Sequence, residues 1–117
     1  MVAYVLISVV ALIHVYIVVL EMFLWDKPYG RRVFGNGAEC ATASKVLAAN
    51  QGLYNGFLAA GLVWGLSQGE AGRPVLWFFL GCVFVAGVYG GLSVSRRILV
   101  VQSVPAAAAG IALWWHV

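Results

Sequence analysis

The sequence predicts an all-α protein, a transmembrane four-helix bundle that crosses the bilayer as a polytopic membrane protein. Two observations support this class. The chain of 117 residues is 63% hydrophobic and only 9% charged, whereas soluble domains carry a charge on roughly a quarter of their residues. Its apolar residues also fall into helix-length runs of about 20 residues, the length that crosses the hydrocarbon of a bilayer. We therefore expect one integral membrane domain over residues 1–117.

The expected helices cover about residues 2–24, 42–66, 74–93 and 98–116. The segment Trp25-Asp26-Lys27-Pro28-Tyr29-Gly30 ends the first, because proline, glycine and charges together interrupt a membrane helix. A loop of about 17 residues should follow it. Pro74 suits the first turn of the third helix, and Pro105 is expected to kink the fourth.

The distribution of Lys and Arg predicts the orientation. The first and third connections carry Lys27, Arg31, Arg32, Lys45, Arg96 and Arg97, and the opposite side carries Arg73. Such an excess marks cytoplasmic loops. We expect a multi-pass protein of the bacterial cell (inner) membrane with both termini outside the cytoplasm. Membrane lipids are the expected partners, and nucleic acid is not, because the basic residues lie between apolar segments.

A polar strip interrupts the second expected helix: Asn50-Gln51-Gly52-Leu53-Tyr54-Asn55-Gly56. Carboxamides are costly in hydrocarbon and normally face other protein or water. On the first helix, His14 and Glu21 are seven residues apart and therefore share a face. In an antiparallel pair, Glu21 should lie near the level of residues 47–51 and His14 near Asn55.

The later helices add polar groups to the same half of the membrane. We expect a polar pocket in the cytoplasmic half, with the ligand-binding residues His14, Glu21, Asn50, Gln51, Tyr54, Asn55, Tyr89 and Gln102. The alternative is that these side chains are interhelical hydrogen-bond partners, worth about 0.6 kcal/mol each in membranes. No metal site and no cofactor is expected, because the two histidines lie at different depths.

Glycine pairs at four-residue spacing predict close helix contacts. The pairs are Gly52/Gly56, Gly61/Gly65 and Gly87/Gly91. They suit packing within the bundle first, and contacts of a homo-oligomer as the alternative.

The set His14, Ile17, Glu21, Trp25 and Phe34, followed by the string from Asn50 to Ala59, resembles a family of small bacterial integral membrane proteins known only as a domain of unknown function. The segments 86–90 and 102–106 resemble later motifs of that family. The resemblance covers essentially the whole chain and implies a four-span protein of about 120 residues. It implies no substrate and no catalytic residue.

A shallower likeness is to small multidrug-resistance exporters, which share the helix count and a membrane glutamate in the first helix, here Glu21. The strong charge bias of the loops and the carboxamide strip depart from that group, so the likeness concerns architecture alone.

Three classes of function follow from these features. In the first, the pocket binds or transports a small amphipathic molecule, with Glu21 as a protonatable counter-charge. In the second, Glu21 and His14 act as acid and base of a membrane enzyme on a lipid-soluble substrate. In the third, the protein is structural or binds a partner. The first is the expectation, and no residue is assigned as catalytic.

Overall fold

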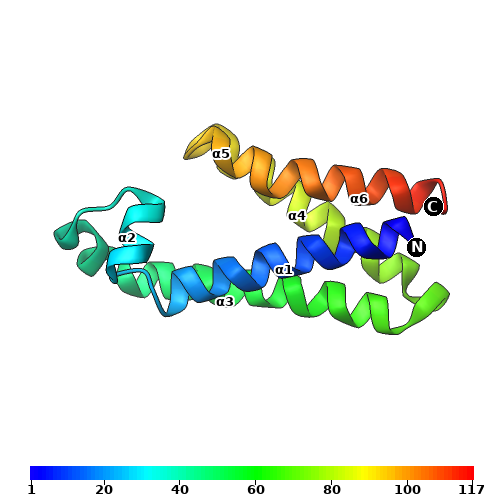
Figure 1. Cartoon of the computed structure of the whole chain (residues 1–117), viewed down its shortest axis with the longest axis horizontal. Helices are drawn as coiled ribbons and strands as arrows, with labels where there is room; N and C mark the ends of the chain where they lie inside the picture. The colour runs from blue at the N-terminus through cyan, green and yellow to red at the C-terminus, as the bar shows by residue number, and fades with distance from the viewer. The chain divides into compact units, whose positions relative to one another are not determined.

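The computed structural model describes residues 1–117 and is entirely helical (Figure 1). Its elements in chain order are α1 (Val2–Met22), α2 (Pro28–Phe34), α3 (Ala38–Ser67), η1 (Gly69–Gly72), α4 (Arg73–Ser93), α5 (Arg96–Ile98), η2 (Leu99–Ser103) and α6 (Val104–Trp114). The all-α class is thus confirmed. The expected bounds of the long helices agree with these within four residues, the largest difference being residue 42 against Ala38.

Three helical segments are long and apolar enough to cross a membrane: Val2–Met22, Gly69–Ser93 and Arg96–Trp114, with mean hydropathies of 2.6, 2.1 and 1.5. Helix α3 is the longest, at 30 residues, but it is not among them. Its carboxamides Asn50, Gln51 and Asn55 lower the hydropathy of its middle. By length and composition, three of the four expected helices are therefore able to span a membrane.

The chain divides into two compact units. We call Met1–Ile13 with Leu58–Val117 the terminal unit, and His14–Phe57 the central unit. The division falls within α1 and within α3, so each of these helices has one part in each unit.

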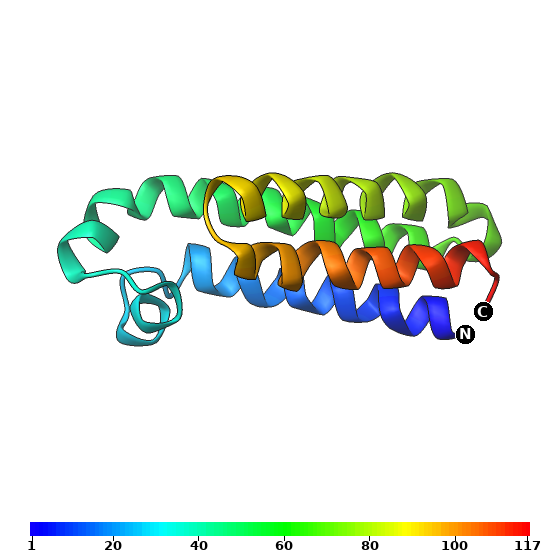
Figure 2. The ribbon, with the colours of Figure 1, turned by 90° about the horizontal axis from the view of Figure 1, so that it is seen from above.

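The terminal unit holds an apolar core. Its members are Ala3, Ile7, Val10, Ala11, Leu62, Leu76, Leu80, Val83, Ala106, Ala109, Ala112 and Leu113. Many of these side chains are small, which lets the helices approach closely, as membrane helices do. Helix α4 contacts both η2 and α6 (Figure 2).

Glycines allow close approaches between elements of the terminal unit. An ideal Cβ on Gly61 would lie 2.3 Å from the ring of Phe79, and one on Gly65 would lie 2.6 Å from Leu76. On Gly87 it would lie 2.7 Å from the backbone nitrogen of Ser103. These glycines therefore pack within the chain, in the way expected first for their spacing.

A π-helical turn, η2, directly precedes α6. Pro105 has no N–H to donate, and its ring displaces the carbonyl four residues earlier. The N–H of Val104 instead bonds to the oxygen of Leu99, five residues back. The irregularity expected from Pro105 is thus a widened turn. Single π-helical turns of this kind occur as bulges within α-helices. The turn η2 carries the buried side chains of Gln102 and Ser103.

The two chain ends meet in the terminal unit (Figure 2). The amino group of Met1 donates a hydrogen bond of 2.9 Å to an oxygen of Val117. Nearby, Arg73 Nη2 donates to the carbonyl oxygen of Leu113 at 2.8 Å. That bond satisfies one of the carbonyls left open at the end of α6.

The connection between α1 and α3 is folded, which corrects the expectation of a loop. Helix α2 occupies its middle, with Pro28 in the first turn and Gly35 in the left-handed conformation (φ 70°) at its end. Proline at a helix start and glycine just past its end are the usual pair of boundary signals. Pro28 had been interpreted only as part of the segment that ends the first helix, and Gly35 fell within the expected loop, so the short helix between them was missed.

Candidate functional site

Glu21 and Asn55 form the polar contact between α1 and α3 in the central unit. Asn55 Nδ2 donates to Glu21 Oε1 at 2.7 Å and also lies 3.1 Å from the carbonyl oxygen of Gln51. Both side chains are half-buried. The carboxyl group of Glu21 forms no ion pair, so its partner is a neutral carboxamide.

Glycines explain why the two helices come this close. An ideal Cβ on Gly52 would lie 2.5 Å from Met22 Cγ and 3.1 Å from Glu21 Cβ. One on Gly56 would lie 3.6 Å from Val18 Cγ2. Because Gly52 has no side chain, α1 reaches the backbone of α3 at the level of Glu21. The pair Gly52/Gly56 therefore also packs within the chain.

The register between α1 and α3 differs from the expected one. Glu21 was expected near residues 47–51, but its partner is Asn55, about one helical turn further along α3. Asn55 had been placed near His14. The cause is the folded connection: α2 and the first turns of α3 occupy the chain that the sequence interpretation had assigned to a loop.

The other predicted residues of the central unit lie in different environments. His14 is fully buried. Asn50 is exposed and donates to the carbonyl oxygen of Val46 at 2.9 Å, within its own helix. Gln51 is exposed, and so is Tyr54, whose ring lies 6.2 Å from that of Phe57. Of the four polar side chains of the strip, Asn55 is the one that hydrogen-bonds to Glu21.

Tyr89 and Gln102 belong to the terminal unit. Tyr89 lies on α4 and is 75% exposed, whereas Gln102 is buried in η2. Beside it, Ser103 Oγ donates to the carbonyl oxygen of Phe84 at 2.8 Å. This bond and Gly87 hold η2 against α4. The role of these residues in ligand binding stays a prediction.

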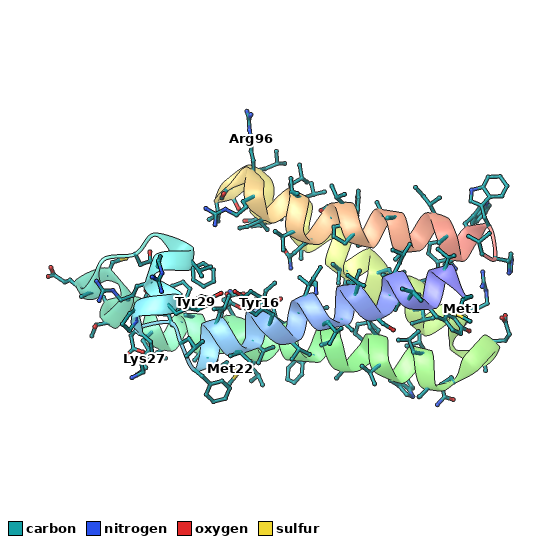
Figure 3. All side chains as sticks on the ribbon, viewed as in Figure 1. Met1, Tyr16, Met22, Lys27, Tyr29 and Arg96 are labelled. Carbon is teal, nitrogen blue, oxygen red and sulfur yellow. The ribbon has the colours of Figure 1, made fainter.

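Several polar contacts of the central unit were missed by the sequence interpretation. The hydroxyl groups of Tyr16 and Tyr29 form a hydrogen bond (Figure 3). Trp25 Nε1 donates to Ser44 Oγ at 3.0 Å, and the ring of Trp25 lies 4.7 Å from that of Phe34. The sequence interpretation had placed Trp25 and Tyr29 only in the segment that ends the first helix, where their rings suit the membrane interface. Their second role depends on α2, which brings Tyr29 back to α1.

An ion pair joins the connection to α3. Lys45 Nζ lies 3.0 Å from Asp26 Oδ2. The hydrogen bond from Lys45 lowers the pKa of the Asp26 carboxyl below its ordinary value, because it stabilises the charged form. No group of three or more His, Cys, Asp or Glu residues lies together as a metal site.

These features define an all-α protein with three helices able to span a membrane and a hydrogen-bonded carboxyl group on one of them. The chain belongs to the family described as "Protein of unknown function (DUF1304)", which it matches over residues 8–114. It is 33% identical over 95 residues to "Uncharacterized protein YpaA" of Lactococcus lactis subsp. lactis (strain IL1403), covering 80% of each chain. No solved structure matches it. The resemblance to a family of unknown function is confirmed; the four-span architecture and the carboxamide motif stay predictions.

Proposed function

We propose that this protein is a four-span protein of a bacterial cell membrane. In this proposal it binds or transports a small amphipathic molecule. The cationic or hydrogen-bond-donating head of that molecule meets Glu21. The observation that carries the proposal is the Glu21 carboxyl group on an apolar helix, bonded to a neutral carboxamide and to no cation.

A carboxyl group in this position is costly to keep. Ionisable residues within membrane helices are rare and normally pair with one another, or mark the path or site of a ligand. Asn55 donates to one oxygen of Glu21, and the second carboxyl oxygen has no partner in the chain. A cation or donor from the ligand would complete the pair.

The topology rests on separate support. The chain ends meet in one unit, which supports an even number of crossings with both termini on one side of the membrane. Helix α3, with 30 residues, is about 45 Å long, more than the hydrocarbon thickness. Its polar middle then lies within the membrane, where the Asn55–Glu21 bond shields it in part. The excess of Lys and Arg in the first and third connections places the termini outside the cytoplasm.

Thermal unfolding in dodecyl maltoside tests the site. The probes are tetraphenylphosphonium, an amphipathic cation, and tetraphenylborate, an anion of the same shape, followed by a panel of amphipathic amines, quinones and lipids. We expect the cation to raise the Tm of the wild type and to have no effect on Glu21→Gln, which keeps the shape of the side chain without its charge. Glu39→Gln is the matched control, because Glu39 is exposed at the start of α3. It should respond to the cation as the wild type does.

Asn55→Leu separates a ligand site from a structural hydrogen bond. If the bond is purely structural, its removal should lower the free energy of unfolding by about 0.6 kcal/mol, the average for a membrane hydrogen bond. The Tm would then fall, and nothing else would change. A ligand site would lose the response to the probe. Destabilisation by both Glu21→Gln and Asn55→Leu, with no compound shifting the wild type, would reject the proposal.

A further inference from the structure

A hollow separate from Glu21 lies in the central unit at the C-terminal end of α2. It has a volume of about 320 Å³ and is lined by Pro28, Arg31, Arg32, Gly35 and Asn36. Two of these five residues carry guanidinium groups. No carboxylate lines the hollow, and the nearby Asp26 is paired with Lys45. Its walls therefore present positive charge.

Arg31 supplies the most specific observation. Its Nε is buried and has no hydrogen-bond partner in the chain. Buried donors are nearly always paired, because an unpaired one loses its hydration without replacement. Arg31 also lines the hollow, so an acceptor that binds there lies beside a guanidinium group whose Nε the chain leaves unpaired.

The backbone around the hollow is fixed by the end of α2. The carbonyl oxygen of Arg31 accepts hydrogen bonds from the N–H groups of Gly35 and Asn36, the latter at 2.9 Å. Gly35 is left-handed (φ 70°), a conformation that a side chain would disfavour. This turn holds Asn36 beside the two arginines. The thiol of Cys40 lies 3.9 Å from Asn36 Oδ1, and the carboxamide nitrogen is left as a donor.

Aromatic contacts hold the hollow against the first membrane helix. The guanidinium carbon of Arg32 lies 5.8 Å from the ring centre of Tyr29, a cation–π arrangement. The hydroxyl of Tyr29 in turn bonds to that of Tyr16 on α1 (Figure 3). The hollow therefore lies just past the end of an apolar helix, next to aromatic residues typical of the membrane interface.

We infer that this hollow binds a phosphate group, and that the group is the headgroup of an anionic phospholipid. Guanidinium groups match phosphate oxygens in paired hydrogen bonds, and the two arginines that line this hollow supply two such groups. Basic residues directly beyond a membrane helix meet anionic lipid headgroups. The site is independent of Glu21 and does not rest on the function proposed above.

The test is a titration of the purified protein in dodecyl maltoside with added probes. The Tm of the protein is measured at each probe concentration. Three probes are used: dioctanoyl phosphatidylglycerol, dioctanoyl phosphatidylcholine and inorganic phosphate. The variant Arg31→Gln/Arg32→Gln removes both guanidinium groups. Arg96→Gln/Arg97→Gln is the matched control, since it removes the same charge from the other basic connection (Arg96, Figure 3). Arg31→Lys keeps the charge and removes Nε.

We expect phosphatidylglycerol to raise the Tm and phosphatidylcholine to have little effect. The titration midpoint should rise about tenfold or more in Arg31→Gln/Arg32→Gln, several-fold in Arg31→Lys, and not in Arg96→Gln/Arg97→Gln. If the double variant does not fold, Arg31→Lys alone decides. Equal weakening by both double variants would show general charge attraction and overturn the site. Equal responses to the two lipids would also overturn it. A response to inorganic phosphate as strong as that to phosphatidylglycerol, and equally dependent on Arg31, would keep the phosphate site and overturn its assignment to a lipid.

Discussion

The terminal and central units are held together in different ways. The buried apolar cluster lies wholly in the terminal unit, where small side chains and glycines bring α4 close to η2 and α6. The central unit buries few apolar side chains, chiefly Leu20, Ala41 and Ala48. It relies on directed polar contacts, among them the Asn55–Glu21 hydrogen bond and the Lys45–Asp26 ion pair.

This difference indicates that the terminal unit mainly supports the fold, whereas the central unit holds the candidate binding groups. Apolar helices gain little from the hydrophobic effect inside a bilayer, so close van der Waals packing holds them together. That is the pattern of the terminal unit. Polar groups in the central unit, by contrast, include a carboxyl group and a guanidinium nitrogen that the chain does not fully satisfy. Both proposed sites therefore lie in the unit with the smaller apolar core.

The largest effect is expected from Gly87→Ala in the terminal unit. The new Cβ would lie 2.2 Å from Ser103 Oγ and 2.7 Å from its backbone nitrogen. The hydroxyl can rotate away, but the backbone nitrogen cannot, so α4 and η2 must separate. Overpacking of this kind costs about 1–3 kcal/mol, measured as a fall in Tm in dodecyl maltoside.

Gly81→Ala is the control on the same helix. No atom lies within 4 Å of its ideal Cβ, and alanine favours a helix over glycine by up to about 1 kcal/mol. We expect no loss of stability. Equal destabilisation by the two variants would contradict close packing as the basis of the terminal unit.

A smaller, local effect is expected from Trp25→Phe in the central unit. Phenylalanine keeps a ring beside Phe34 but loses the hydrogen bond to Ser44. A hydrogen bond of this kind is worth about 1 kcal/mol, so the open form of the connection should become roughly fivefold more populated. Limited trypsin digestion at Lys27, Arg31 and Arg32 measures this as faster cleavage.

Trp115→Phe serves as the control, since Trp115 is 69% exposed. It should be cleaved at the wild-type rate. A Trp25→Phe variant as resistant as the wild type would show that α2 is held by its other contacts alone.

The smallest effect is expected from the Asp26–Lys45 ion pair, because exposed pairs contribute little. The pKa of Asp26 is lowered by the hydrogen bond from Lys45. Its contribution is therefore fully present above the ordinary pKa of about 3.9 and is lost as the pH falls through the lowered value. The difference in Tm between wild type and Asp26→Asn should be constant above about pH 5 and shrink toward pH 3. A difference that grows on acidification would show the opposite linkage.

The sequence predicted much of the helical pattern. Apolar runs, together with Pro28 and Pro74, mark helix boundaries in the chain itself, so the bounds of the long helices follow from local signals. Helix α2 was not predicted because its boundary residues, Pro28 and Gly35, also suit a loop. Seven residues cannot show a helical period strongly enough to decide between the two.

The candidate site could be predicted only in part. The sequence by itself determined that Glu21 and a run of carboxamides interrupt apolar helices, because charge and polarity are properties of each residue. The tertiary structure decided that Asn55 is the partner of Glu21, and that Arg31 Nε is buried without one. Those outcomes depend on how much chain α2 takes up and on the missing side chain of Gly52, which sets where α1 meets α3. Register between helices is a long-range property, so local patterns in the sequence do not contain it.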